Sequence, residues 1–162
     1  MFGSVAAAAF AFDPAKKSAS ITLSSANQTA TETAGGSYVC ALALSALSIG
    51  QETAFTIGPA VASNSPGVGI GNASTVFSAE LGSTTNSICA FLNGDVELAG
   101  AIIGNVGFTF TAGDVIRVKP VSATQVQWSK NGGAYSASFT HAIPGAIYAG
   151  VTLVNNQSIT GA

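Results

Sequence analysis

The stretch TAGDVIRVKPVSATQVQWSKNGG, residues 111–133, decides the fold because apolar and polar side chains alternate along it. Ile116 and Val118 lie on one face of an extended chain, and Arg117 and Lys119 lie on the other. After a turn the alternation resumes in 125–128, and the Asn-Gly-Gly that ends the stretch is typical of another turn. The stretch therefore predicts two paired strands with a buried face and a solvent face. The predicted core residues are Phe108, Phe110, Val118, Val126 and Trp128.

The same period-two pattern recurs through the rest of the chain. Turn residues return about every ten positions, which is the spacing of an all-β sandwich. Asn93-Gly94-Asp95 separates SICAFL from VELAGAII and predicts a hairpin, because Asn and Gly accept positive φ angles. The sequence predicts one domain over 12–162, an antiparallel β-sandwich, preceded by an N-terminal arm over 1–11.

The composition limits the classes of partner. The 162 residues include five basic and seven acidic ones, so only 7% of the chain is charged and the net charge is −2. A nucleic-acid footprint needs several clustered Lys or Arg residues, so nucleic acid is not expected as a partner. No apolar run approaches the roughly 20 residues of a membrane-spanning helix, and membrane insertion is not expected. So few charges give little repulsion between copies, which favours a protein that works inside an assembly.

The sequence lacks the motifs of the common enzyme classes. It contains no G-x-S-x-G, H-E-x-x-H or C-x-x-C, and His141 is the single histidine. Asp95 and Glu97 can lie on one strand face as a carboxylate pair, but acids beside a hairpin are more often simply solvated. Cys40 and Cys89 lie in apolar runs, which favours two buried free thiols over a disulfide. We expect no enzyme activity, no cofactor and no metal site.

The order of these motifs resembles the SPRY (B30.2-like) domain, a concanavalin A-like sandwich. The segment FTFTAGDVIRV is similar to that family's f-x-x-GD-x-i-g-v element, and VQWSKNGG to its i-x-F-x-x-NG hairpin. FDPAKKSASITLSSANQTAT, PGVGIGNAST and AIPGAIYAGVTL resemble its opening, its vGia strand and its closing strand. The resemblance spans about 12–154. Two elements depart from the family: its Gly-Lys-aromatic-Tyr-aromatic-Glu strand is reduced to SIGQETAFTI, and Lys119-Pro120 replaces an acidic residue.

The resemblance implies a domain that binds other molecules through loops at one end of the sandwich. Free-standing, low-charge versions resemble proteins of tailed bacteriophage particles. The first hypothesis is therefore a virion structural protein, a capsid decoration or a tail or fibre subunit. It would contact other virion proteins in a multi-copy assembly, and it would be located in the particle. The alternative is a module that recognises a host-surface glycan or peptide. The candidate binding residues are Asn64, Asn93, Asp95, Asn131 and Tyr135, and the candidate assembly residues of the arm are Met1, Phe2 and Phe10.

Overall fold

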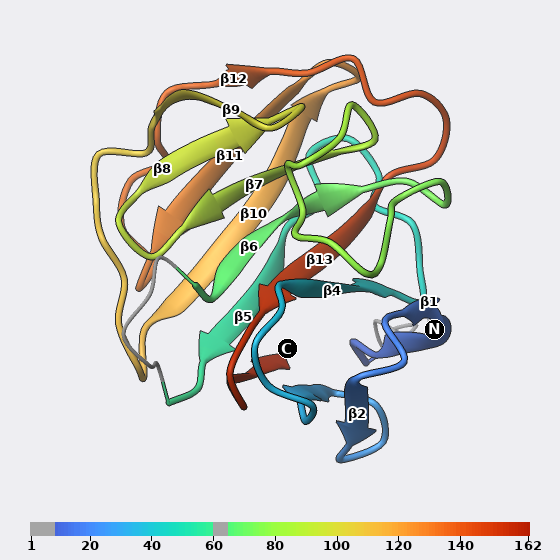
Figure 1. The fold of residues 1–162 in the computed structure, drawn as a ribbon. Coiled ribbons are helices and arrows are strands. Elements are labelled where there is room, and N and C mark those ends of the chain that lie inside the picture. The colour runs from blue at the N-terminus through green and yellow to red at the C-terminus, as the bar shows by residue number, and fades with distance from the viewer. Residues whose placement is uncertain (1–8, 60–64) are drawn as a thin grey trace, which may run out of the picture.

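The protein is a sandwich of two antiparallel β-sheets, as the alternation predicts (Figure 1). The structure is a computed structural model that describes residues 9–59 and 65–162. Each sheet has seven strands, and the part of the chain that is described contains no helix long and apolar enough to cross a membrane. In spatial order, sheet A contains β1 (Phe12–Lys17), β4 (Val39–Ala43), β13 (Tyr148–Leu153), β6 (Gly67–Gly71), β7 (Ser87–Phe91), β8 (Asp95–Leu98) and β9 (Ala101–Asn105). Sheet B contains β12 (Phe139–Thr140), β11 (Gln125–Lys130), β10 (Val115–Ser122), β5 (Thr53–Ile57), β14 (Ser158–Gly161), β3 (Thr29–Glu32) and β2 (Ile21–Ser24).

The core lies between the sheets and contains the residues that the alternation selects. Val118, Val126, Trp128 and Phe110 are fully buried, while Phe108 is partly buried and packs against the core. Trp128 of sheet B also donates its indole Nε1–H to the carbonyl oxygen of Val68 in sheet A, at 2.8 Å. The polar groups of a buried aromatic side chain need such a partner. Trp128 therefore joins the two sheets by a hydrogen bond as well as by packing.

The middle of sheet A is covered on its outer face as well. In β6 the apolar Val68 and Ile70 point into the core, while glycines occupy the alternate positions. At Gly69 a side chain would collide with the backbone of β7, since its Cβ would lie 2.0 Å from the Ile88 carbonyl oxygen. This flat glycine face allows the 72–86 connection to pack closely over the sheet. Beneath it lies a second apolar cluster of Cys40, Leu42, Leu81, Cys89 and Phe91.

Both cysteines are free and buried in that second cluster, as predicted. Burial raises the pKa of the Cys40 thiol to about 12, and burial also raises the pKa of Cys89 well above its ordinary value. A thiol that stays protonated is a poor nucleophile and a poor metal ligand. The two cysteines therefore act as small apolar core residues.

The described part of the N-terminal arm packs on its own domain. The ring of Phe10 meets the rings of Phe12 and Phe55 edge-on, with centroids 4.9 and 5.3 Å apart. It also lies against Gly161 of the last strand, where any side chain would collide with it. Phe10 thus has an intramolecular role in addition to any contact with another subunit. Met1 and Phe2 lie outside the described residues, so an intermolecular role for the arm stays a prediction.

Candidate functional site

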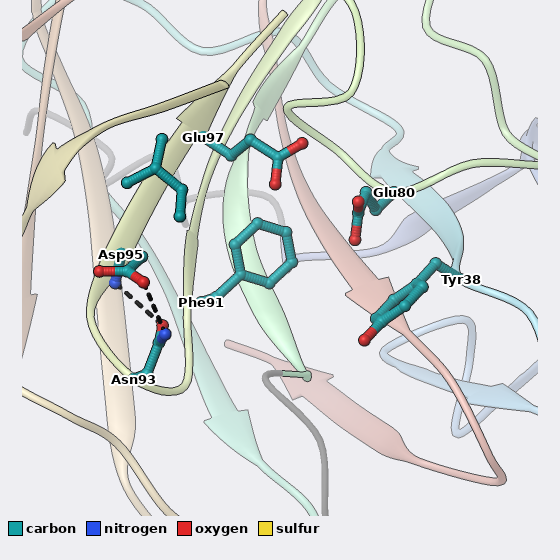
Figure 2. A pocket seen from close by; sticks show the side chains of 7 residues that line it. Tyr38, Glu80, Phe91, Asn93, Asp95 and Glu97 are labelled. Carbon is teal, nitrogen blue, oxygen red and sulfur yellow. Dashed lines mark hydrogen bonds between the residues drawn. The ribbon is translucent and has the colours of Figure 1, made fainter. Parts of the chain in front are cut away.

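A pocket of about 170 Å³ opens on the outer face of sheet A, beside the area that the 72–86 connection covers (Figure 2). Figure 2 shows the ring of Phe91 with Glu80 and Tyr38 on one side, Asp95 and Asn93 on the other, and the Glu97 carboxylate above it. Ile102 of β9 completes the lining. We call these seven residues the acidic pocket.

Strand alternation explains why these side chains share one face. Ile88 and Ala90 of β7 and Val96 of β8 point into the core, so Phe91, Asp95 and Glu97 point outward. Tyr38 comes from the position just before β4, and Glu80 comes from the 72–86 connection. The pocket therefore joins three parts of the chain that are far apart in sequence.

The charged forms of the two glutamates in the acidic pocket are disfavoured. Burial raises the pKa of Glu97 above its ordinary value. Burial also raises the pKa of Glu80, and repulsion from the Glu97 carboxylate raises it further. Each carboxylate would be better stabilised by a positive charge placed between them.

Asn93 and Asp95 form a hydrogen-bonded turn at the lower rim of the pocket. The Asn93 Nδ2 donates to the Asp95 carboxylate at 2.7 Å, and the Asp95 backbone N–H donates to Asn93 Oδ1 at 3.0 Å. Asn105 Nδ2 donates to the same carboxylate at 3.0 Å. Gly94 between them has φ +87°, as the hairpin prediction requires. Two of the sequence candidates thus line the pocket, and their polar atoms mainly shape the turn.

A β-bulge next to the pocket exposes two neighbouring isoleucines. Val96 pairs with Gly104 and Glu97 with Ile102, which leaves Ile103 as an extra residue in β9. In an unbroken strand alternate residues face the core, but here Ile102 is 67% exposed and Ile103 is 43% exposed. An apolar patch therefore borders the acidic pocket.

Asn131 belongs to a second network at the same end of the sandwich. Its Nδ2 donates to the Asp114 carboxylate at 2.8 Å, and Lys130 forms an ion pair with Asp114 at 2.9 Å. Burial alone would raise the pKa of Asp114, but the contacts with Lys130 and Asn131 lower it to about 2. The segment 106–114 runs between the two turns, and a shallow hollow there is lined by both Asn93 and Lys130. Asn93 and Asn131 therefore flank one surface.

Tyr135 makes its contacts elsewhere, over the solvent face of sheet B. Its hydroxyl donates to the Glu52 carboxylate, and the Lys119 ammonium lies 3.6 Å from the centre of its ring. Arg117 forms an ion pair with the same Glu52 at 3.4 Å. The structure thus does not group Tyr135 with Asn93 and Asp95. Arg117 and Lys119 therefore belong to a structural cluster of side chains on the solvent face of sheet B.

Four pocket residues, Tyr38, Glu80, Phe91 and Ile102, are not among the sequence candidates. The candidate Asn64 lies outside the described residues. Tyr38 and Glu80 belong to irregular segments whose position depends on how the chain folds back over sheet A. Ile102 lies in a segment that alternation assigns to a strand, and no local signal predicts the bulge that exposes it. The sequence allows Glu97 to be a carboxylate partner of Asp95, whereas in the structure the Glu97 carboxylate interacts with that of Glu80.

His141 follows β12 as a buried residue, and it lies outside the acidic pocket. Burial lowers the pKa of its imidazole, so the neutral form is favoured. Its Nδ1 accepts a hydrogen bond from the Ile143 backbone N–H at 3.3 Å. Within residues 9–59 and 65–162, no group of three or more His, Cys, Asp or Glu side chains could hold a metal ion.

Comparison with solved structures identifies the fold. The chain is similar to the SPRY domain of human HERC1, with a TM-score of 0.78 and 18% identity over 93% of this chain and 96% of that one. It is also similar to another human SPRY domain, with a TM-score of 0.68 and 16% identity over 88% of this chain and 94% of that one. The TRIM65 PSpry domain has a TM-score of 0.67 and 11% identity over 95% of this chain and 89% of that one. No protein-family model matches the sequence, and no curated protein matches it significantly. The chain therefore has the fold of the SPRY domains, the two-sheet sandwich that the sequence resemblance implied.

Proposed function

We propose that this protein is a non-catalytic module that binds another protein through the acidic pocket and the adjoining isoleucine patch. One observation supports this most directly: a hollow bordered by two exposed isoleucines lies where sheet A is not covered by its own connections. Adjacent exposed apolar side chains with a polar rim are characteristic of protein interaction surfaces. The similarity to SPRY domains, which typically act as protein-binding modules, supports the same function.

The proposal can be tested by selecting ligands on the whole protein. A library of random twelve-residue peptides displayed on particles is selected on the immobilised chain, and the binders are then measured against two variants. Ile102→Ser replaces an exposed apolar side chain of the isoleucine patch by a small polar one. Ile49→Ser changes a residue of similar exposure, 63% against 67%, that lies in the connection between β4 and β5. Binding should be lost with Ile102→Ser and kept with Ile49→Ser. If Ile102→Ser has no effect, or if no binders emerge, the proposed site is refuted.

The narrower proposal is that the module serves as a subunit of a tailed bacteriophage particle. It is supported by the low charge of the chain and by exposed apolar side chains such as Leu44 and Ile49, which are 54% and 63% exposed. Such a surface has little electrostatic protection against contact with other subunits. Mass spectrometry of purified bacteriophage particles whose genome encodes this chain should detect the protein in multiple copies per particle. Its absence from such particles would exclude this role but leave the binding module intact.

A further inference from the structure

The acidic pocket contains negative charge that the described part of the chain does not neutralise. Three carboxylates line it, and no Lys, Arg or His does. The ion pairs among the described residues use Asp13, Glu52 and Asp114, so Glu80 and Glu97 have no cationic partner there. Asp95 is already engaged by the amides of Asn93 and Asn105. Two carboxylates thus remain available to a ligand.

The walls of the pocket suit a cation carried on an aliphatic stem. The rings of Phe91 and Tyr38 offer apolar contact, and Tyr38 remains 36% exposed. A Lys or Arg side chain can pack its methylene groups on such surfaces while its charged end meets the carboxylates. The protein makes this kind of contact within its own chain, where the Lys16 ammonium lies 4.0 Å from the centre of the Tyr148 ring.

The size of the pocket also limits which ligand groups can enter it. A volume of about 170 Å³ accommodates one long side chain, and it is well below the 300–1,000 Å³ of typical small-molecule sites. A macromolecular ligand would therefore insert a single side chain, while neighbouring apolar residues rest on Ile102 and Ile103. This arrangement resembles the anchor residues of protein interfaces, which fill a pocket surrounded by less critical contacts.

We infer that the acidic pocket receives a lysine or arginine side chain from the bound protein, between the carboxylates of Glu80 and Glu97. This inference rests on the proposed function, since it specifies which partner residue occupies the site. The ion pair forms in a partly desolvated pocket, where charge pairing contributes more than on an open surface. The preferred ligand segment therefore has one basic residue next to apolar residues.

The peptides selected on the wild-type chain test this inference directly. Their sequences should be enriched in a single Lys or Arg with apolar neighbours. Replacing that basic residue by Gln in a synthetic copy should weaken binding roughly tenfold or more, because a charge-assisted hydrogen bond is lost. This part of the experiment alters only the peptide, so its result does not depend on the folding of a protein variant.

The matching change in the protein is the double substitution Glu80→Gln with Glu97→Gln. It should reduce affinity by a similar factor, while the control Glu52→Gln, just before β5 of sheet B, should leave it unchanged. Circular dichroism and thermal unfolding check that each variant is folded. If binders depend on Ile102 but carry no basic residue and tolerate the double substitution, the inference is overturned and the proposed function stands. If binding does not depend on Ile102, the proposed function itself is overturned.

Discussion

Glu32 is a buried carboxylate that holds two turns together, and replacing it by Gln should destabilise the fold. The residue is only 1% exposed. Its side chain accepts backbone N–H hydrogen bonds from Ala34 at 2.7 Å, Gly35 at 2.8 Å and Asn156 at 2.9 Å. The first two lie after β3 and the third lies between β13 and β14. Gln keeps the shape, but its amide group has to face at least one of these N–H donors.

The expected cost follows from that loss of an acceptor. A hydrogen bond to a charged group contributes about 1.5–3 kcal/mol, and leaving a buried donor unsatisfied costs a similar amount. We expect Glu32→Gln to lower the free energy of unfolding by about 2–4 kcal/mol. For a domain of this size the thermal midpoint should fall by about 5–15 °C. Urea unfolding followed by the fluorescence of Trp128, the single tryptophan, measures the change.

Acid titration provides a second readout with a defined sign. Burial alone would raise the pKa of Glu32, but the N–H donors of Asn156, Ala34 and Gly35 outweigh it and hold the pKa below the ordinary 4.5. The carboxylate therefore contributes stability above about pH 4.5, and this contribution is lost as the pH falls through the lower folded-state pKa. The pKa of Asp114 is also lowered, so Asp114 contributes to the pH dependence as well. The difference in the free energy of unfolding between wild type and variant, measured at each pH, isolates the contribution of Glu32.

The control for this experiment is Glu52→Gln, which changes an exposed carboxylate and should alter stability by less than about 0.5 kcal/mol. Our reasoning is refuted if Glu32→Gln lies within about 1 kcal/mol of the wild type at pH 7. It is also refuted if wild type and variant lose stability equally as the pH falls below 4.5.

Three further outcomes follow from the packing. Trp128→Phe should cost about 2–4 kcal/mol in unfolding monitored by circular dichroism, because it leaves a cavity and removes the hydrogen bond to the Val68 carbonyl. Gln127→Ala on the solvent face should cost less than about 0.5 kcal/mol. Cys40 and Cys89 should react slowly with a thiol reagent in the folded protein and fast in denaturant; a mass two hydrogens lower would reveal a disulfide instead. Phe10→Ala should lower the free energy of unfolding by about 2–4 kcal/mol in calorimetry, since the ring is partly buried among other aromatic rings, and an unchanged midpoint would show that the arm is dispensable for stability.

The sequence predicts the sandwich because strand alternation and turn chemistry are local properties. The 111–133 stretch forms β10 and β11 with the expected faces, and the Asn93 turn joins β7 to β8. The strand β10 also continues through Pro120, where a proline suggests a turn. Its partner β5 pairs only with 115–118, so the missing N–H of Pro120 breaks no hydrogen bond to that strand.

The candidate site was predictable only in part, because it depends on contacts between distant segments. Asn93 and Asp95 could be located from their turn. Glu80 reaches the pocket through the irregular 72–86 connection that packs over sheet A, while Tyr38 directly precedes β4. Alternation has no means of showing which residues an irregular connection will bring over a sheet. The sequence likewise places Phe10 in an arm, because its aromatic partners Phe12 and Phe55 lie in strands that only the fold brings together.

The bulge at Ile103 affects how copies of this protein can associate when they lie close together. The strand β9 ends sheet A, and its sequence AIIGN has neither a charge nor a proline, the usual features that stop an edge strand from pairing with another chain. In a protein with so little electrostatic repulsion, a regular edge of this kind would promote open-ended lateral growth of the sheet. The extra residue disrupts the spacing of the main-chain donors and acceptors. Crowded molecules can then meet through discrete side-chain contacts without merging into a continuous ribbon.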